Sequence, residues 1–284
     1  MKNMVSFQSF IIDPEYPMGM YIHVYEAEAK DSRIKERGKA GGAVTAILLY
    51  LLEEKIVDTI IVARKKHGLR GETYVVKTPE EILEAVGSIW SVVPYTLGLK
   101  EKLLSPEVKK SVFVGLPCQA QFLRQMKMFP LLESDFSSKI YLIISLFCMG
   151  TFAIESFLSY VHTSYRVSPD DITSVEIVKD KLLIKHVKGE LTISVDEVLP
   201  YLQHGCLTCP DYTGVFADIS AGRSPESEST LLISRNKMAD KIIRDAASKG
   251  YIGIREASVK VIDNAIEKSR EKILRSYKYV STLI

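Results

Sequence analysis

Apolar and polar positions alternate with two different periods along most of the chain, and this alternation predicts strands and helices in turn. Short apolar runs rich in β-branched residues predict strands over residues 20–25, 56–63, 111–115 and 140–147. Stripes with helical spacing follow these runs and predict helices over residues 42–52, 79–87, 119–127 and 154–161. Alternation of this kind is typical of an α/β fold with a largely parallel sheet flanked by helices, in which ligands collect at the carboxyl ends of the strands.

The pattern changes between residues 171 and 198. Three short stretches with strict alternation, separated by Lys-Asp and Lys-Gly turns, cover residues 174–178, 182–187 and 191–195. We interpret them as a small antiparallel insertion. Strands over 217–220 and 230–234 and helices over 237–249 and 259–277 are predicted beyond it. No repeat or linker interrupts the chain, so we expect residues 1–284 to form a single α/β domain that carries this insertion.

Composition is that of an ordinary globular protein, with 46% hydrophobic and 25% charged residues. The 37 Lys and Arg residues and 35 Asp and Glu residues give a net charge of +2 and are interspersed, which does not favour nucleic-acid binding. No apolar run reaches the roughly 20 residues of a transmembrane helix, and no signal peptide is evident. We expect a cytoplasmic protein, or one held at a membrane surface through a partner.

The four cysteines occupy positions where ligands or metals are expected to bind. Cys118 and Cys148 each follow a predicted buried strand, which places both at the edge where ligands bind. Cys206 and Cys209 form a Cys-x-x-Cys pair between a glycine and a proline, and such a loop can wrap around a metal centre. Disulfides are not expected in the cytoplasm. Isolated free cysteines are often small buried hydrophobic residues, but that interpretation leaves the paired spacing unexplained.

Four thiolates are the complement of a [4Fe–4S] cluster. A structural zinc site suits the same ligands, although zinc more often takes two Cys-x-x-Cys pairs. A redox-active Cys206/Cys209 pair alone would leave Cys118 and Cys148 without a role. The spacing of the cysteines therefore does not decide between a [4Fe–4S] cluster and a structural zinc site.

A second candidate site is the segment from Gly38 to Thr45, directly before a predicted helix. Its small residues allow close approach of a ligand, and the N–H groups at a helix start favour phosphate. The segment matches neither a Walker loop nor the Gly-x-Gly-x-x-Gly fingerprint. Glycine pairs of this kind often only make turns.

Taken together, these segments resemble a known family. The similarity rests on Gly41-Gly42-Ala43-Val44-Thr45-Ala46, Gly87-Ser88, Gly115-Leu116-Pro117-Cys118-Gln119, Leu146-Phe147-Cys148, Gly205-Cys206-Leu207-Thr208-Cys209-Pro210 and Ala217-Asp218-Ile219-Ser220. Their order is similar to that in the beta subunits of coenzyme F420-reducing hydrogenases and the related dehydrogenases. The resemblance covers residues 38–234, most of the chain.

The resemblance implies FAD and a [4Fe–4S] cluster as cofactors. FAD would be bound by Lys39, Gly41, Gly42, Thr45, Gly87, Ser88 and Gly115, and the cluster by Cys118, Cys148, Cys206 and Cys209. The protein would then be an oxidoreductase subunit that transfers electrons between a hydride carrier, such as the deazaflavin coenzyme F420, and a one-electron partner. That partner would be a hydrogenase, dehydrogenase or reductase subunit.

Two departures from the family pattern limit these expectations. Residues 1–37 contain no cysteine, whereas many relatives carry a ferredoxin-like module there. The segment Ala221–Thr230 also lacks the Gly-Trp-Ser-Thr ending of the relatives, so the hydride carrier could differ. Two alternatives remain open: a zinc-stabilised scaffold subunit, and an electron carrier with a cluster but without flavin.

Overall fold

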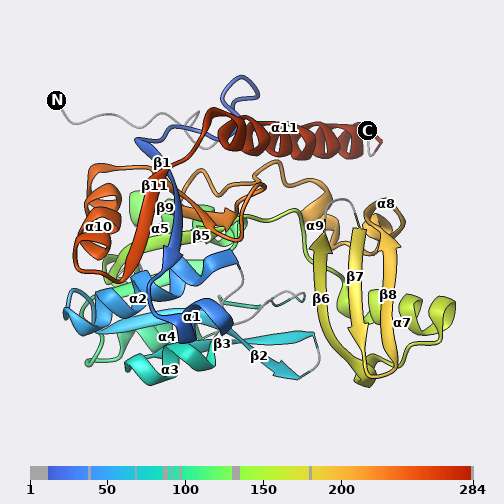
Figure 1. Ribbon diagram of the computed structural model, residues 1–284, viewed down its shortest axis with the longest axis horizontal. Coiled ribbons are helices and arrows are strands. Elements are labelled where there is room, and N and C mark those ends of the chain that lie inside the picture. Colours follow the sequence, from blue (N-terminus) through green and yellow to red (C-terminus); the bar gives the residue numbers. More distant parts are fainter. Residues whose placement is uncertain are drawn as a thin grey trace.

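A mixed eight-stranded sheet forms the centre of the computed structural model, which describes residues 12–37, 40–67, 69–85, 89, 91, 93–95, 98–129, 135–178 and 181–282 (Figure 1). The strands lie in the order β11-β1-β10-β9-β5-β4-β2-β3. Their bounds are β1 (His23–Ala29), β2 (Thr59–His67), β3 (Arg70–Val76), β4 (Ser111–Gly115), β5 (Ile140–Leu146), β9 (Ile219–Arg223), β10 (Thr230–Ser234) and β11 (Ile252–Glu256).

The four central strands are parallel: β2 pairs with β4, β4 with β5, and β5 with β9. This confirms the α/β prediction for the centre of the sheet. Both ends of the sheet are antiparallel, because β2 turns back into β3 and because β9, β10, β1 and β11 pair antiparallel. The pattern did not predict β3 or β11, since neither strand has a continuous apolar run; most residues of β3 are only half-buried.

Successive side chains of the central strands point to opposite faces of the sheet, and a hydrophobic core covers each face. Ile60, Val112 and Ile144 pack with α2 (Ala43–Glu53), α3 (Pro79–Glu84) and α10 (Lys237–Ser248). Ile61, Phe113 and Ile143 pack on the other face with α4 (Leu99–Leu104) and α5 (Pro117–Met128). The long helix α11 (Val259–Ser281) covers β1 and β10 through Val261 and Ala265. The remaining described helices of this part are the short α1 (Ser32–Arg37) and α6 (Asp135–Ser138).

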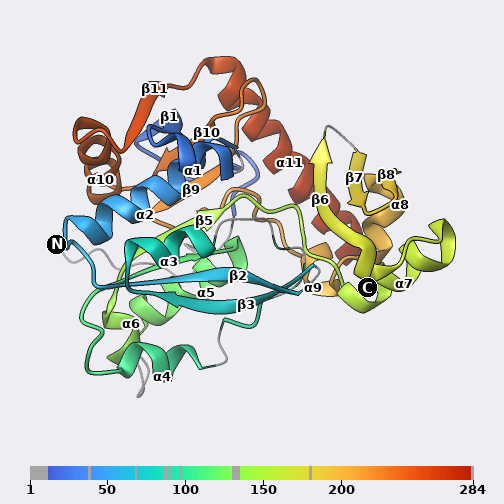
Figure 2. The ribbon, with the colours of Figure 1, turned by 60° about the horizontal axis from the view of Figure 1, so that its bottom comes forward.

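The predicted antiparallel insertion forms a separate three-stranded sheet of β6 (Ile172–Val178), β7 (Lys181–His186) and β8 (Gly189–Ser194). Its apolar face packs on α7 (Ile154–Tyr165) through Phe157 and Val161. Two short helices, α8 (Val195–Val198) and α9 (His204–Leu207), lead the chain back to the large sheet. Figures 1 and 2 show this second sheet beside the large one, with α11 running from the large sheet toward α9.

Among the described residues, none of the helices combines the length and the apolar character that crossing a bilayer requires.

Candidate functional site

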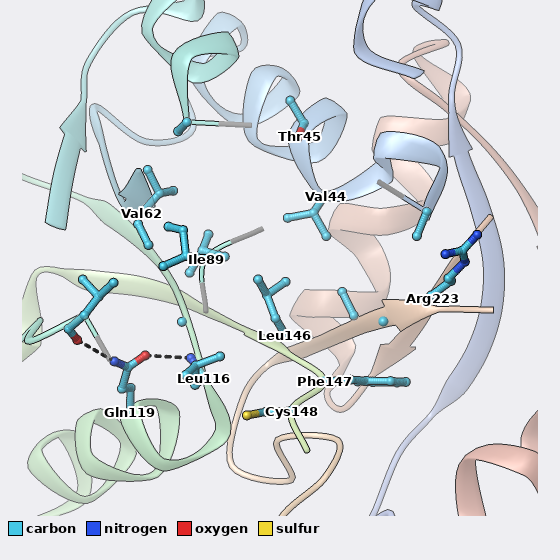
Figure 3. A pocket seen from close by; sticks show the side chains of 18 of the residues that line it. Val44, Thr45, Val62, Ile89, Leu116, Gln119, Leu146, Phe147, Cys148 and Arg223 are labelled. Carbon is cyan, nitrogen blue, oxygen red and sulfur yellow. Dashed lines mark hydrogen bonds between the residues drawn. The ribbon is translucent and has the colours of Figure 1, made fainter. Parts of the chain in front are cut away.

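A cavity of about 580 Å³ lies at the carboxyl ends of the parallel strands (Figure 3), and residues of β6 in the second sheet also line it. Gly115 at the end of β4, Leu146 at the end of β5 and Arg223 at the end of β9 line it, together with the start of α2 and Ile177 of β6. This is the edge where an α/β sheet is expected to bind ligands. The volume lies within the range of small-molecule and cofactor pockets.

The wall of the cavity is mainly aliphatic. Val44 and Leu48 of α2, Val62 of β2 and Leu146 contribute apolar side chains to it. Among the described residues that line the cavity, only Glu176 and Arg223 have charged side chains. An apolar cleft with few polar groups suits a flat aromatic ring system better than a highly charged substrate.

The turn Ala40–Gly42 leads into α2 at one end of this cavity. Gly41 and Gly42 have φ values of +77° and +70°, which favour glycine. A Cβ atom on Gly42 would also lie 2.9 Å from the carbonyl oxygen of Ile34, so close packing excludes a side chain there. The N-cap residue Gly42 has no side chain to cap α2; Thr230 Oγ1 accepts from the Ala43 N–H at 3.3 Å. The start of α2 therefore keeps the character of an anion site.

The predicted FAD residues fall into two groups. Gly42, Thr45 and Gly115 line the cavity, and Gly41 belongs to the turn beside it. The predictions at Lys39, Gly87 and Ser88 lie outside the described residues.

Packing within the chain accounts for Gly115, because a Cβ atom there would lie 2.4 Å from the ring of Phe113. Gln119 fixes the adjacent turn: its Oε1 accepts from the Leu116 N–H at 2.8 Å, and its Nε2 donates to the Val93 carbonyl at 3.1 Å (Figure 3). The end of β4 is therefore held in one conformation beside the cavity.

Three segments bring the four cysteines together. Cys118 lies in the first turn of α5, Cys148 lies two residues after β5, Cys206 belongs to α9, and Cys209 follows in the next loop. The Cys148 N–H donates to the Tyr212 carbonyl at 2.9 Å, which joins the second segment to the third. Cys148 also lines the cavity (Figure 3).

The thiols interact with one another. Burial first, and then the charges of Cys209, Cys148 and Cys206, raise the pKa of Cys118 to about 11, although one side of this residue is exposed. Burial also raises the pKa of Cys148, and the Cys206 and Cys209 charges add to that effect. These electrostatic effects connect the four thiols, and the Thr151 N–H, which donates to Cys206 Sγ at 3.4 Å, holds Cys206 against the segment that follows Cys148.

The donor set suits a cationic centre, because such a centre relieves the repulsion among four thiolates. Among the described residues, no group of three or more His, Cys, Asp or Glu side chains is arranged to hold a single metal ion. A lone zinc ion needs all its sulfur ligands about 2.3 Å from one point. A [4Fe–4S] cluster attaches each thiolate to a different iron atom, so the sulfur atoms stand farther apart.

Two cations of α11 lie against the cysteine segments. Lys272 is only 1% exposed, and its Nζ donates to the carbonyl oxygens of Cys148 and Asp211, both at 2.6 Å. Arg275 donates from Nη2 to the Met149 carbonyl at 2.6 Å and to the Cys206 carbonyl at 3.3 Å.

Neither residue was predicted from the sequence. The signal that could have found Lys272 is its helical spacing from Val261, Ala265 and Ser269, which form the buried face of α11.

The segment that departs from the family pattern is the hairpin between β9 and β10. Glu26, 6% exposed, accepts from the Oγ atoms of Ser224, Ser227 and Ser229 at 2.6, 2.7 and 3.3 Å, and from Arg255 Nε at 3.0 Å. Burial opposes ionisation, but these hydrogen bonds hold the pKa of Glu26 below its usual value. A carboxylate therefore fixes the hairpin to β1.

This hairpin also reaches the cavity. Arg223 lines the cavity and forms an ion pair with Glu228 at 2.6 Å. The main chain of Glu228 packs on Gly41, where an added Cβ atom would lie 3.0 Å from the Glu228 carbonyl oxygen. The altered segment is thus part of the wall, in contact with the turn that precedes α2.

Two family descriptions match this chain, and both concern the beta subunit of coenzyme F420 hydrogenase/dehydrogenase. Residues 24–100 match the description of its N-terminal part, and residues 108–260 match the description of its C terminus.

Individual proteins agree with this match. The chain is 31% identical over 269 residues to coenzyme F420 hydrogenase subunit beta of Methanosarcina barkeri, covering 93% of this chain and 92% of that protein. It is 32% identical over 225 residues to the protein of the same name from Methanococcus voltae, covering 78% and 80%. A chain in a xenon-derivatised structure of the F420-reducing [NiFe] hydrogenase complex from Methanosarcina barkeri superimposes with a TM-score of 0.86 at 29% identity, covering 96% of this chain and 94% of that chain.

Proposed function

The chain belongs to the beta-subunit family of coenzyme F420 hydrogenases and dehydrogenases, an oxidoreductase family, and we propose that it transfers electrons between a hydride carrier and a one-electron partner within a redox complex. One observation carries the proposal: Cys148 belongs both to the wall of the cavity and to the four-cysteine site. A cofactor in the cavity would therefore lie next to a metal centre at the cysteines.

FAD is the cofactor that the cavity suits. Gly41, Gly42 and Thr45 would hold its phosphates at the start of α2, where the helix dipole and N–H groups favour negative charge. The aliphatic residues Val44, Val62 and Leu146 would pack on the flat ring and exclude water from it. Gly115 and the Gln119-fixed turn would keep this part of the wall in place.

A [4Fe–4S] cluster is the centre that the cysteines suit. Cys118, Cys148, Cys206 and Cys209 would each supply one thiolate, and Lys272 and Arg275 would hold the main chain of the ligand segments. When bound, the flavin supplies two-electron chemistry with single-electron release, and the cluster supplies one-electron transfer. The residues of the chain position the two groups side by side.

The hydride carrier would be coenzyme F420 or a similar two-electron donor. Its binding would involve the hairpin that carries Arg223, because this guanidinium lies at the cavity and has only an exposed carboxylate, Glu228, as its ion-pair partner among the described residues. An anionic carrier could replace Glu228 there. The partner would be a hydrogenase or dehydrogenase subunit, as the names of the matching family and of the relatives suggest.

Anaerobic purification of the full chain tests the proposal. We expect one FAD, about four iron atoms and about four sulfides per chain, and a cluster signal in electron paramagnetic resonance after reduction. Cys148→Ala should lose the iron and sulfide, since a three-thiolate site exposes the cluster to solvent. Met149→Ala, the neighbouring change, should keep them.

Three other results would contradict parts of the proposal. Zinc without iron or sulfide would indicate the scaffold function instead. A full cluster without flavin would indicate a simple electron carrier, and would leave the cavity to another ligand. Cys148→Ala with unchanged iron and sulfide would remove Cys148 from the ligand set.

A further inference from the structure

Helix α11 brings two cations to the four-cysteine site from outside the segments that match the family. The matching segments end at residue 260, whereas α11 continues to Ser281. Figure 1 shows α11 crossing from the large sheet to α9, the helix that contains Cys206. Lys272 and Arg275 are one turn apart on this helix, so both can reach the same site.

Lys272 has an unusual environment for a buried ammonium group. Both hydrogen bonds that its Nζ donates to described residues go to neutral main-chain carbonyls, those of Cys148 and Asp211. A buried charge without an opposite charge is costly, so a negative group nearby is expected. The Asp211 carboxylate contributes, but it accepts from the N–H groups of Gly214 and Val215 and also faces the half-buried cation Arg235.

Arg275 adds a second positive charge on the same side. Its guanidinium donates to the Met149 and Cys206 carbonyls, and its buried Nε has no partner in the described part of the protein. Burial lowers the pKa of Arg275, and the charges of Cys148, Cys206 and Cys209 oppose that effect. The positive charge near the cysteines therefore exceeds the negative charge that the single carboxylate of Asp211 supplies.

An iron–sulfur cluster bound to four thiolates would provide the missing negative charge. Four thiolates outweigh the charge of the oxidised core, so the ligated centre is anionic, and reduction by one electron makes it more so. A fixed positive charge nearby stabilises the reduced form more than the oxidised form, by Coulomb's law in a medium of low dielectric constant. Charge near a cluster is one of the factors that set its reduction potential.

We propose that Lys272, assisted by Arg275, raises the reduction potential of the cluster and holds its ligand segments in place. Lys272 is a positioning residue in this role, because its hydrogen bonds connect the Cys148 segment to the loop that follows Cys209. Arg275 connects the Cys148 segment to α9 in the same way. This inference depends on the proposed cluster at the four cysteines.

The test compares three variants of the full chain, each purified anaerobically with its cofactors. Lys272→Gln keeps a hydrogen-bond donor and removes the charge, and Arg275→Gln does the same at the second position. Lys278→Gln removes one lysine charge from an exposed position on the same helix. The measurements are iron and sulfide content and the midpoint potential of the cluster, followed by electron paramagnetic resonance during a redox titration.

We expect Lys272→Gln to retain iron and sulfide and to shift the midpoint potential to a more negative value. Arg275→Gln should shift it in the same direction by a smaller amount, and Lys278→Gln should leave it unchanged. An unchanged potential in cluster-loaded Lys272→Gln overturns the inference. If Lys272→Gln loses the cluster, the potential of Arg275→Gln is the test instead. An unchanged midpoint potential in that variant also overturns the inference. Wild-type protein without a cluster would instead contradict the proposed function.

Discussion

Val44 is the residue whose position distinguishes best between a ligand-binding cavity and a purely structural core. Its side chain extends from the first turn of α2 into the cavity (Figure 3). The neighbouring glycines are less informative, because the positive φ of Gly42 and its contact with Ile34 would make any substitution there strain the turn itself. Leu49 provides a comparison, since it packs on the same core without lining the cavity.

Val44→Trp should therefore weaken flavin binding while the protein still folds. The indole would occupy the cavity next to the start of α2, and we expect flavin affinity to fall by at least about tenfold, which corresponds to about 1.4 kcal/mol. Leu49→Trp should retain flavin, although overpacking could lower its stability by about 1–3 kcal/mol. The ratio of flavin to protein absorbance measures the effect. Stoichiometric flavin in Val44→Trp would place the cofactor elsewhere.

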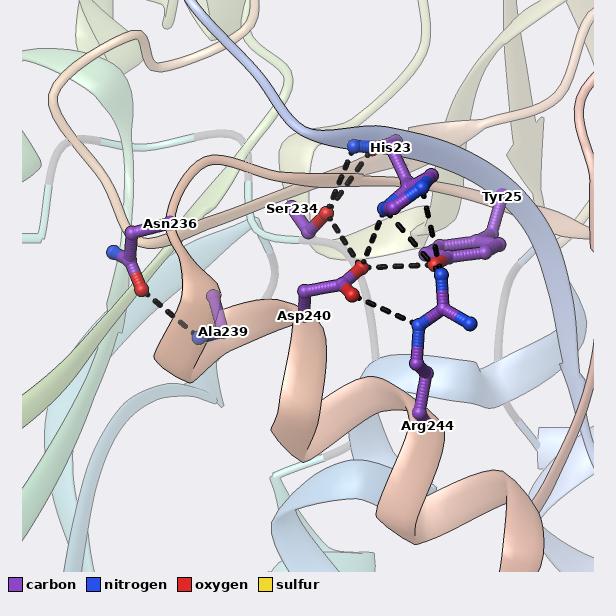
Figure 4. Close-up of polar contacts among 7 residues, drawn as sticks. All are labelled: His23, Tyr25, Ser234, Asn236, Ala239, Asp240 and Arg244. Carbon is purple, nitrogen blue, oxygen red and sulfur yellow. Dashed lines mark hydrogen bonds and ion pairs between the residues drawn. The ribbon is translucent and has the colours of Figure 1, made fainter.

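At the scale of elements, a polar network joins α10 to the sheet (Figure 4). Asp240 of α10 accepts from Tyr25 of β1 at 2.8 Å, from Ser234 of β10 at 3.0 Å and from Arg244 at 2.8 Å, and it pairs with His23 at 3.0 Å. Burial opposes ionisation, but these hydrogen bonds hold the pKa of Asp240 below its usual value of 3.8. The carboxylate thus stabilises the packing of α10 on β1 and β10.

Asp240→Asn should lower the free energy of unfolding at neutral pH by about 1–3 kcal/mol, because Asn cannot accept all these hydrogen bonds. Since the folded pKa lies below the unfolded one, the contribution of Asp240 is complete above pH 3.8 and decreases as the pH falls through the folded pKa. Denaturant unfolding at several pH values should show the difference between variant and wild type shrinking in acid. A difference that is constant with pH would contradict this explanation.

The matched control is Asp245→Asn on the same helix. Asp245 pairs with Lys241 at the surface, at 2.5 Å, and such exposed pairs contribute little. We expect the free energy of unfolding to change by less than about 1 kcal/mol.

At the scale of the whole molecule, the cavity and the cysteine site are built from different parts that meet at the end of β5. The cavity uses α2, the central strands and β6, and it shares α5 and the segment after β5 with the cysteine site, whereas Cys206 and Cys209 come from α9 and the loop beyond it. Helix α11 then contacts the cysteine segments from the side. This arrangement predicts that the two half-reactions can be separated by mutation.

Cys206→Ser should abolish electron transfer to a one-electron acceptor protein such as a ferredoxin, because it removes one of the four thiols. It should leave the bleaching of bound flavin by reduced coenzyme F420 largely unchanged, since Cys206 does not line the cavity. Anaerobic rapid-mixing absorbance measures both reactions, and retained flavin with unchanged circular dichroism serves as the folding control. Loss of both reactions with the fold intact would contradict a separable pathway.

The local pattern of the sequence determined much of the architecture. The predicted strands 111–115 and 230–234 coincide with β4 and β10, and the helix predicted to begin at residue 79 begins there, with a capping box of Thr78 and Glu81 at the start of α3. The three alternating stretches form the second sheet, and the four cysteines lie together. These features depend on the period of apolar residues and on chemistry within a few positions, which a sequence displays directly.

Tertiary structure alone decided the features that depend on distant contacts. Glu26 binds serines about two hundred positions away, and Lys272 reaches the main chain of Cys148 across 124 positions. Strands β3 and β11 form because neighbouring strands supply hydrogen bonds that their own weak patterns do not predict. The cavity also exists only where segments far apart in the sequence meet. Burial and charge compensation are properties of these assembled surroundings: the helical spacing of Lys272 indicates the buried face of α11, but only the folded chain shows which carbonyl oxygens its ammonium group meets.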